Sequence, residues 1–580
     1  MKRSIQFLLP YLLRHRRSLI LGMGSLLIKD ILGASLPLVI RMGVDEMTRT
    51  FRVETVLWLA AALAGLSVLK GIFQYWMRVI LIGLSRDIEY ELRNELFAKL
   101  TTLDLSYYGR TRTGDILARA TNDLNAVRMM LGPAVMYWFE TSLTLVLAVG
   151  VMMYVDPRLT LLALMPAPLV SFAVIFFGRR IHDRFEAIQT MFSGISSRVQ
   201  ENLAGVRVVR AYAQEEAEIE HFAVLNREYI GENIRLARLS GFFMPLLQAL
   251  TGMGFMIVLW AGGYRVLQGS LSIGSFVMFN TYMGMLIWPM IAMGWVVNLM
   301  QRGTASLGRI RDILEQSPSI TPPLQPKVLP TPIRGEVDLD DIVVRFGDRT
   351  ALNGVSMRIE AGSTVAIVGH TGSGKTTLVN LIPRLLDPES GVVRIDGVDL
   401  RDLDPEQVRR EIGFVPQETY LFSALLSENI AFGVKDATPE QILEAAEIAG
   451  LGPDLASFPN GLDTVVGERG LTLSGGQKQR TAIARAVLRN PRVLILDDAL
   501  SSVDTMTEER ILRALSGVMR GRTTILISHR VSTVRHASRI FVIEHGRVAE
   551  QGNHDELVLA GGYYADLYQK QLLEEELEAI

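Results

Sequence analysis

The first half of the chain contains six long runs of apolar residues, each bounded by basic or polar positions. A helix needs about 20 residues to cross the hydrocarbon core of a bilayer, and every run meets that length. The alternative, six buried core helices of a large soluble protein, agrees less well with the basic flanks. We therefore expect six membrane spans, near residues 18–44, 55–83, 129–154, 158–178, 241–267 and 273–300.

The connections between these spans are either very short or very long. Residues 155–157 join the third span to the fourth, and residues 268–270 join the fifth to the sixth. The links at 84–128 and 179–240 are charged and have a helical pattern, and a 20-residue helical extension reaches about 30 Å past the bilayer. Basic residues before the first span and after the fourth place both long links in the cytosol. The N-terminal residues before the first span predict a basic amphipathic helix at the membrane surface.

The second half follows a different pattern. A proline-rich stretch at residues 317–334 predicts an extended linker. After it, short apolar runs of strand length alternate with helical stretches, which is typical of an α/β domain. We predict a membrane bundle of six long helices with cytosolic extensions at residues 1–316, followed by an α/β domain at 335–580.

Charge and composition agree with this division. Residues 1–330 carry a net charge of +9 and residues 331–580 one of −11, although the whole chain is nearly neutral at −2. The basic residues of the first half flank apolar runs, so we expect membrane lipids with anionic headgroups, and no nucleic acid, as their partners. The chain contains no cysteine, which excludes disulfides, thiolate catalysis and cysteine metal sites.

A complete phosphate-binding motif lies in the second half. Residues 369–376 match the P-loop pattern, after the strand-like run 364–368 and at the start of a helical stretch. Glycines in such a loop let backbone N–H groups surround phosphate oxygens. The lysine would add positive charge at the β- and γ-phosphates, and the threonine hydroxyl after it would bind Mg²⁺. The predicted nucleotide-binding residues are Gly369, His370, Thr371, Gly372, Ser373, Gly374, Lys375, Thr376 and Thr377.

Two further segments narrow the class of NTPase. The apolar run 493–496 ends at Asp497, a carboxylate suited to a water-mediated contact with Mg²⁺. Residues 473–477 combine a hydroxyl, two glycines and a helix start, which suits a γ-phosphate. They resemble the signature sequence of the ABC superfamily, which binds the nucleotide held by the partner's ATPase domain. The resemblance therefore implies dimerisation, with the partner's nucleotide contacted by Leu473, Ser474, Gly475, Gly476 and Gln477.

Other motifs of that family follow in order along the ATPase half. Phe346 resembles the aromatic residue that stacks on adenine, Gln417 the Q-loop glutamine that contacts Mg²⁺, and His529 the switch histidine that contacts the γ-phosphate. Asp504 resembles the D-loop aspartate, and residues 464–470 resemble a segment that exporters use at the domain interface. The resemblance implies an α/β P-loop ABC ATPase domain that uses ATP and Mg²⁺.

The membrane half is similar to the exporter type with six helices per half-transporter. Residues near 105–115 and 200–214 resemble its two coupling helices, and in this family the second reaches the partner's ATPase domain. The resemblance thus covers nearly the whole chain. It implies an integral protein of the bacterial inner membrane with a cytosolic ATPase domain, in which ATP hydrolysis drives export by alternating access.

One position departs from the family pattern. The residue after Asp497 is normally a glutamate that polarises the attacking water, and here it is Asp498. Aspartate is one methylene shorter, and a displacement of 1 Å can slow catalysis by about 100-fold. The signature at 473–477 and His529 are intact. Together with Asp498 this resembles one subunit of heterodimeric bacterial multidrug exporters, whose partner carries the Walker B glutamate. The resemblance implies that the chain's own P-loop site binds Mg-ATP but hydrolyses it slowly. The alternative is a homodimer in which Asp498 serves as the base.

The substrate has to be inferred from the spans. Ionisable residues at mid-membrane depth indicate a cavity or a buried pair, and methionine beside aromatic residues suits a pliable pocket. Interhelical pairing without substrate contact is an equal alternative. Lys29 and Asp30 are adjacent on one helix, so we expect them to have separate partners. The candidate substrate residues are Lys29, Asp30, Gln74, Glu140, Met285 and Trp288.

Three functional classes remain open at this point. The first is an ATP-driven exporter of amphipathic drugs or lipids. The second is a homodimeric lipid or glycolipid flippase with the same architecture, which a cavity rimmed by Lys and Arg at both leaflets would favour. The third is a soluble ABC-type ATPase acting in translation or DNA repair, which the six apolar runs oppose.

Overall fold

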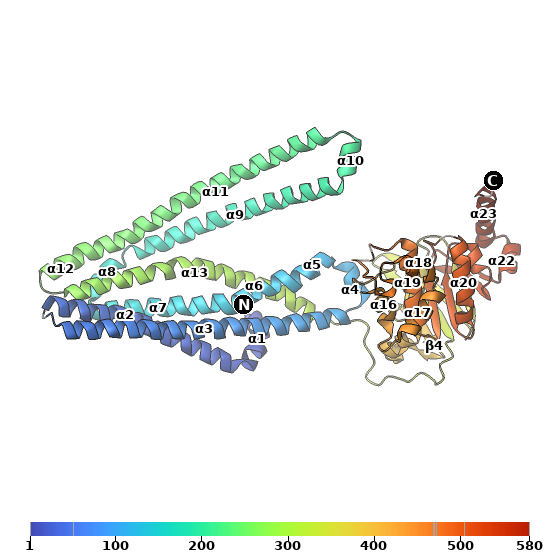
Figure 1. The fold of residues 1–580 in the computed structure, drawn as a ribbon, viewed down its shortest axis with the longest axis horizontal. Helices are drawn as coiled ribbons and strands as arrows, with labels where there is room; N and C mark the ends of the chain where they lie inside the picture. Colours follow the sequence, from blue (N-terminus) through green and yellow to red (C-terminus); the bar gives the residue numbers. More distant parts are fainter. Residues whose placement is uncertain (1, 50, 468–469, 471, 504, 579–580) are drawn as a thin grey trace. The chain divides into compact units, whose positions relative to one another are not determined.

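The computed structural model describes residues 2–49, 51–467, 470, 472–503 and 505–578. The chain divides into two compact units, one formed by residues 1–101 and 112–316 and the other by residues 102–111 and 317–580. The predicted linker at 317–334 thus belongs to the second unit. Figure 1 shows long helices in the first half of the chain and mixed sheets and helices in the second.

Within the described residues, six helices are long and apolar enough to cross a membrane: Arg16–Arg49, Val53–Thr102, Thr113–Val155, Pro157–Ala204, Glu215–Leu267 and Ile273–Leu314. Each contains one predicted span, and this confirms the predicted helical bundle. The elements of this half are α1 (Lys2–Arg14), α2 (Arg16–Arg49), α3 (Val53–Thr102), α4 (Leu105–Arg110), α5 (Thr113–Ala118), α6 (Leu124–Met129), α7 (Val135–Val155), α8 (Pro157–Ala163), α9 (Ala167–Ala204), α10 (Val206–Ala211), α11 (Glu215–Ile257), α12 (Gly263–Leu267) and α13 (Ile273–Leu314).

Local sequence explains some of the interruptions and ends of these helices. π-helical turns at Arg119–Asp123, Met130–Ala134 and Val258–Gly262 interrupt the long helices, and the second contains Pro133, whose missing N–H a widened turn tolerates. The tight link between α7 and α8 follows from Asp156, whose carboxylate accepts the backbone N–H of Leu159 at 3.0 Å and caps α8.

Helix α13 packs along α2 and α7, whereas α9 and α11 pack mainly against each other (Figure 1). Fully buried Met278, Phe279 and Tyr282 form part of the α13 contact, and the Tyr282 hydroxyl donates to the backbone carbonyl of Ala34 on α2. At the other end of the bundle, Asp123 accepts hydrogen bonds from Arg309 on α13. The short α4 and α10 lie in the segments predicted as coupling helices.

The second unit contains two sheets. A four-stranded antiparallel sheet has the order β2-β1-β4-β5, and a six-stranded sheet has the order β10-β9-β3-β8-β7-β6. The strands are β1 (Val337–Phe346), β2 (Arg349–Ile359), β3 (Thr364–Val368), β4 (Ser390–Ile395), β5 (Val398–Asp399), β6 (Ile412–Val415), β7 (Val493–Asp497), β8 (Thr523–Ile527), β9 (Arg539–Glu544) and β10 (Arg547–Gly552).

Helices cover the six-stranded sheet, and its strands β3, β7 and β8 are almost entirely buried. Parallel strands covered in this way read as continuous apolar runs, which is why the sequence pattern identified them. The helices are α14 (Lys375–Leu381), α15 (Pro405–Arg410), α16 (Leu426–Ile430), α17 (Pro439–Ile448), α18 (Gly452–Ser457), α19 (Gly475–Leu488), α20 (Thr505–Met519), α21 (Val531–Val534), α22 (His554–Ala560) and α23 (Tyr563–Glu578), with 3₁₀ turns at Leu400–Asp402, Ala431–Gly433 and Gly461–Asp463.

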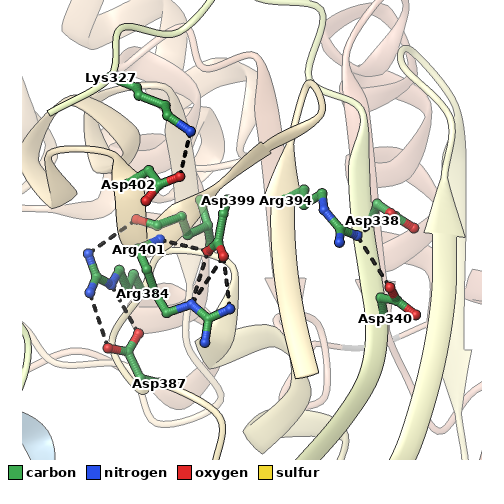
Figure 2. Close-up of polar contacts among 10 residues, drawn as sticks. Lys327, Asp338, Asp340, Arg384, Asp387, Arg394, Asp399, Arg401 and Asp402 are labelled. Carbon is green, nitrogen blue, oxygen red and sulfur yellow. Dashed lines mark hydrogen bonds and ion pairs between the residues drawn. The ribbon is translucent and has the colours of Figure 1, made fainter. Parts of the chain in front are cut away.

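The end of the proline-rich segment packs onto this unit. The backbone N–H of Lys327 donates to the Asp402 carbonyl at 2.8 Å, and its ammonium lies 2.7 Å from the Asp402 carboxylate (Figure 2). Leu329 is buried in the core below. Figure 2 also shows the neighbouring ion pairs of Arg384 with Asp387 and Arg401 with Asp399. The contacts of Lys327 and Leu329 tie part of the predicted linker to the ATPase half.

Candidate functional site

The predicted nucleotide residues gather at one edge of the six-stranded sheet. Strands β3, β8, β7 and β6 are parallel neighbours, so their carboxyl ends meet at that edge. The P-loop begins directly after β3, His529 follows β8 by two residues, and Asp497 ends β7. Gln417 follows β6 by two residues and is exposed. Residues separated by up to 160 positions therefore converge through strand order.

Two P-loop glycines are required by the backbone. Gly369 and Gly374 have φ angles of +155° and +107°. A Cβ on Gly369 would lie 2.2 Å from the carbonyl oxygen of Ile543, and one on Gly374 would lie 2.7 Å from that of Ala351. The loop thus packs against the backbone of neighbouring strands, where no side chain fits.

Lys375 begins α14 and is buried inside the loop. Its ammonium donates to the backbone carbonyls of Gly369 at 2.8 Å and His370 at 2.9 Å. Burial lowers the pKa of Lys375, and the nearby carboxylates of Asp497 and Asp498 oppose that shift. The positive charge is therefore held where phosphate oxygens would enter, with two carboxylates close by.

Asp497 has the surroundings that a Mg²⁺ site needs. Its carboxylate is buried, one oxygen has no hydrogen-bond partner among the described residues, and Thr376 bonds to the carboxylate. Burial and the charge of Asp498 raise the pKa of Asp497, as expected for a buried carboxylate that lacks a full set of partners. A carboxylate and a hydroxyl oxygen are ligands that Mg²⁺ prefers, and phosphates and water normally complete its shell. These residues therefore fit the ion.

Asp498 sits on a strained backbone immediately after Asp497. Its φ is +50°, its N–H donates to the carbonyl of Ile527 at 2.9 Å, and its own carbonyl accepts the Ser501 hydroxyl at 3.0 Å. Burial and the charge of Lys375 lower the pKa of His529, while the charge of Asp498 opposes this shift. Asp498 and His529 thus influence each other electrostatically across the site.

The signature segment begins helix α19. Ser474 and Gln477 form a capping box, with the Gln477 N–H bonded to the Ser474 hydroxyl at 3.3 Å and the Ser474 N–H bonded to the Gln477 side chain at 2.9 Å. A Cβ on Gly476 would lie 3.1 Å from the backbone oxygen of Ser502. The segment is therefore closely packed against the residues just before Asp504, whereas Leu473 is buried in the helical core.

Comparison with known families agrees with this arrangement. Residues 19–290 match the family model described as the ABC transporter transmembrane region, and residues 352–501 match the one described as ABC transporter. This chain belongs to the ABC transporter family. Both parts lie in one chain, as in half-transporters of the exporter type.

Individual relatives place it among the exporters. The chain is 36% identical to a protein of Bacillus subtilis (strain 168) described as the probable multidrug resistance ABC transporter ATP-binding/permease protein YheI, over 99% of this chain and 98% of that one. It is 34% identical to an ATP-dependent lipid A-core flippase of Syntrophus aciditrophicus (strain SB), over 97% and 94% of the two chains. The solved structure of a bacterial Atm1-family ABC exporter with ATP bound matches with a TM-score of 0.79 and 28% identity, covering 96% and 98%. The chain is thus a membrane-integral exporter half with a cytosolic ATPase domain that hydrolyses ATP for transport.

The remaining predicted residues of the exporter's ATPase half have different surroundings. Phe346 ends β1 and is 53% exposed. Asp504 lies outside the described residues, as do Glu468 and Arg469 within the predicted interface segment 464–470. His370 packs its ring on Tyr563.

Sequence motifs missed Gln479, which connects the signature helix to the segment after Asp498. This side chain is buried, donates to the Ser501 hydroxyl at 2.9 Å and accepts the Ser502 N–H at 2.9 Å. A glutamine two residues after a capping box has no local signal for such a role. Its position just beyond the signature was the only hint.

The membrane candidates of the exporter do not form one cluster. The Lys29 ammonium lies 2.7 Å from Asp30 and 2.6 Å from Glu140, and the Thr144 hydroxyl donates to Asp30 at 3.4 Å. The expectation of separate partners for Lys29 and Asp30 is therefore wrong. The long lysine side chain is flexible enough to reach its own neighbour and α7 at once.

The other candidates lie elsewhere in the bundle. Gln74 is half-buried on α3. Met285 packs against the apolar core that contains Met152 and Tyr282, which is a structural role. Trp288 is 61% exposed on α13. A ring exposed to this degree is available to lipid, a substrate or a second subunit.

Proposed function

We propose that this half-transporter works in a heterodimer, and that its own P-loop site binds Mg-ATP but hydrolyses it slowly. In this proposal the signature residues complete a fast site on a partner chain that carries the Walker B glutamate. The observation that carries the proposal is that an aspartate, Asp498, stands where the family normally has glutamate. Its carboxylate is one methylene short at the position of the catalytic base.

The backbone contacts of Asp498 support the proposal that its carboxylate falls short of the attacking water. The N–H bond to Ile527 and the Ser501 bond to its carbonyl hold the residue from both sides. The main chain therefore resists a forward shift that would restore the missing length. General-base catalysis requires a hydrogen bond of roughly 3 Å to the water, so the short carboxylate leaves a gap.

The proposed division of labour among the other residues follows from their positions. The P-loop residues and Phe346 bind the nucleotide, Lys375 neutralises phosphate charge, and His529 contacts the γ-phosphate. Thr376, Asp497 and Gln417 would hold Mg²⁺, which would neutralise the β- and γ-phosphate oxygens when bound. Closure of the two ATPase domains would then open the membrane cavity outwards.

The proposed substrates are amphipathic small molecules. The relative YheI is described as a probable multidrug resistance transporter, which supports this class. Buried Lys29 and Asp30 and half-buried Glu140 form a cluster of two carboxylates and one ammonium. Intramembrane charges of this kind commonly mark a transport pathway. Trp288 offers an exposed aromatic surface on α13.

The deciding test measures Mg-ATP turnover by the purified chain in lipid nanodiscs, as wild type and as Asp498→Glu. We expect ATP binding with near-background turnover for the wild type, and a gain towards about 100-fold for Asp498→Glu wherever the chain dimerises. Wild-type turnover of about 1–10 s⁻¹ that Asp498→Asn abolishes would instead establish a self-sufficient homodimer.

A homodimeric lipid or glycolipid flippase is the second candidate. The 34% identity to a lipid A-core flippase over almost the full length favours it. The two candidates separate in proteoliposomes of the chain by itself. ATP-dependent flipping of a fluorescent lipid without any partner chain supports the flippase, whereas transport that requires a second half-transporter supports the heterodimeric exporter.

A further inference from the structure

The last helix, α23, contacts two loops of the nucleotide site, although no family motif lies on it. The Gln571 side-chain amide donates to the backbone carbonyl of His529 at 2.6 Å. The same side chain accepts the backbone N–H of Val531 at 2.7 Å. One carboxamide therefore holds the main chain on both sides of Arg530. A bidentate contact of this kind restricts rotation of the peptide units that carry His529.

Helix α23 is itself firmly anchored. The Glu550 carboxylate accepts the backbone N–H groups of Tyr563 at 2.6 Å and Tyr564 at 3.5 Å, which satisfies the free donors at the helix start. Tyr564 is fully buried, and its hydroxyl lies 2.7 Å from His554 Nδ1. Tyr564 and Gln571 are seven residues apart and so share one helix face. Tyr564, which anchors the helix, and the contact of Gln571 with the main chain, hereafter the Gln571 clamp, therefore lie on the same side of the helix.

The loop that carries His529, which we call the switch loop, is also held on its other side. The Arg530 guanidinium donates to the carbonyl of Val503 at 3.1 Å, next to the D-loop aspartate, and pairs with the buried carboxylate of Glu508 on α20. Glu508 also accepts the hydroxyl of Thr533. The loop that carries His529 is thus held between α23 and the start of α20.

Helix α23 also contacts the P-loop directly. The ring of Tyr563 meets that of His370 with centroids 4.4 Å apart and an interplanar angle of 60°. His370 is the second residue of the P-loop. The first turn of α23 therefore packs against the P-loop, and its third turn holds the switch loop.

We propose that Gln571 is a positioning residue for ATP hydrolysis, because it orients the backbone that aims His529 at the γ-phosphate. Through Tyr563 and Gln571, helix α23 keeps the P-loop and the switch loop in a fixed relation. Arg530 extends this restraint to the D-loop. The proposal rests on the proposed function, in that it takes the site of Lys375 and His529 to be a nucleotide site.

The test uses the full-length chain in nanodiscs with Gln571→Leu and the matched control Gln569→Leu. Gln569 lies on the same helix but is exposed. For Gln571→Leu we expect several-fold faster amide hydrogen exchange at Val531, because its acceptor is lost, and unchanged exchange in the control. The dissociation constant for Mg-ATP should change less than about twofold in both, because neither residue contacts the P-loop.

Turnover is compared in the Asp498→Glu background, in which the site regains a full-length base. Gln571→Leu should lower the turnover number by about 10- to 100-fold through misplacement of His529, with Gln569→Leu unaffected. Gln571→Glu keeps the acceptor for Val531 but sets a carboxylate oxygen against the His529 carbonyl. Its turnover number should therefore lie between those of Gln571→Leu and Gln569→Leu. Equal exchange and equal turnover in the leucine variants would overturn the proposal.

Failure of the proposed function would give a different set of results. If no Asp498→Glu chain turns over, the Gln569→Leu control included, the fault lies in the assignment of this site or in a missing partner. In that case the amide hydrogen exchange rate of Val531 still tests whether Gln571 holds the switch loop. A loss of Mg-ATP affinity in Gln571→Leu equal to its loss of turnover would overturn the positioning role, since it would indicate general damage to the site.

Discussion

At the scale of single residues, the nucleotide site depends on backbone geometry as much as on side-chain chemistry. Asp498 carries the right charge but adopts a left-handed φ of +50° that its bonds to Ile527 and Ser501 maintain. Gly369 and Gly374 leave no room for a Cβ. The loops therefore hold the reacting groups in one geometry, and small changes in side-chain length should have large kinetic effects.

Phe346 provides a clean prediction at this scale. Its exposed ring ends β1 and should stack on the adenine base. Stacking on an aromatic side chain contributes about 1–3 kcal/mol, so Phe346→Ala should weaken Mg-ATP binding by roughly tenfold. Phe346→Tyr preserves the π face and should bind as the wild type does. Equilibrium binding of a fluorescent ATP analogue would measure this, and equal affinity of Phe346→Ala and Phe346→Tyr would contradict the stacking role.

At the scale of elements, ion pairs join helices that are distant in sequence. Lys29 connects α2 to Glu140 on α7, and Asp123 connects the third long helix to Arg309 on α13. The second pair lies in the predicted cytosolic extensions. Burial by itself would raise the pKa of Asp123, but hydrogen bonds from Arg309 and Ser306 outweigh it and hold that pKa below its ordinary value.

This shift predicts a defined pH dependence of stability. A carboxyl with a lowered pKa in the folded state stabilises the fold above its unfolded pKa of about 4, and the gain disappears as the pH falls through the folded value. Asp123→Asn should therefore lower the unfolding midpoint at pH 7 by about 2–4 °C, a modest effect because Arg309 is half exposed.

The difference between wild type and Asp123→Asn should shrink as the pH falls below about 4. Asp312→Asn is the matched control, since Asp312 lies on α13 with its side chain 66% exposed. Thermal unfolding of the detergent-solubilised chain followed by circular dichroism would measure both. A difference that stays constant between pH 7 and pH 3 would contradict the assignment to Asp123 ionisation.

At the scale of the whole molecule, the question is which chain provides the second half. Residues of α10 lie in the segment that resembles the second coupling helix, and Val208 is 61% exposed there. In the ATPase half, Tyr420, Phe422 and Phe432 form an exposed aromatic patch shortly after Gln417. Exposed apolar patches commonly mark interaction surfaces, so a partner's coupling helix is the expected neighbour.

The absence of cysteine allows a direct test of this arrangement. Val208→Cys and Phe432→Cys versions of the chain are mixed in the membrane and treated with a short bis-maleimide. In a heterodimer we expect no covalent dimer from this chain alone, because its coupling helix faces a different protein. Efficient cross-linking between the two versions on reducing gels, which remove disulfide-linked dimers and leave the thioether cross-links, would show a homodimer. A chain that carries both cysteines on one copy controls for cross-links within a single subunit.

The apolar pattern was enough to predict the six spans and the α/β domain, because helices in lipid and buried parallel strands both require continuous apolar runs. The motif residues lie just after β3, β6, β7 and β8, whose carboxyl ends are neighbours, and their roles in nucleotide binding stay predictions. These signals are local, since each lies within one run or one loop.

Tertiary structure decided everything that depends on which elements are neighbours. The clamp by Gln571, the Arg530–Glu508 pair and the Gln479 bridge join residues on different elements, and a polar side chain in a helix carries no local mark of a distant partner. The same limit explains the wrong expectation for Lys29, whose partners depend on the packing of α2 against α7. A sequence specifies the chemistry each side chain offers, whereas contact between side chains arises only when the folded chain brings their elements together.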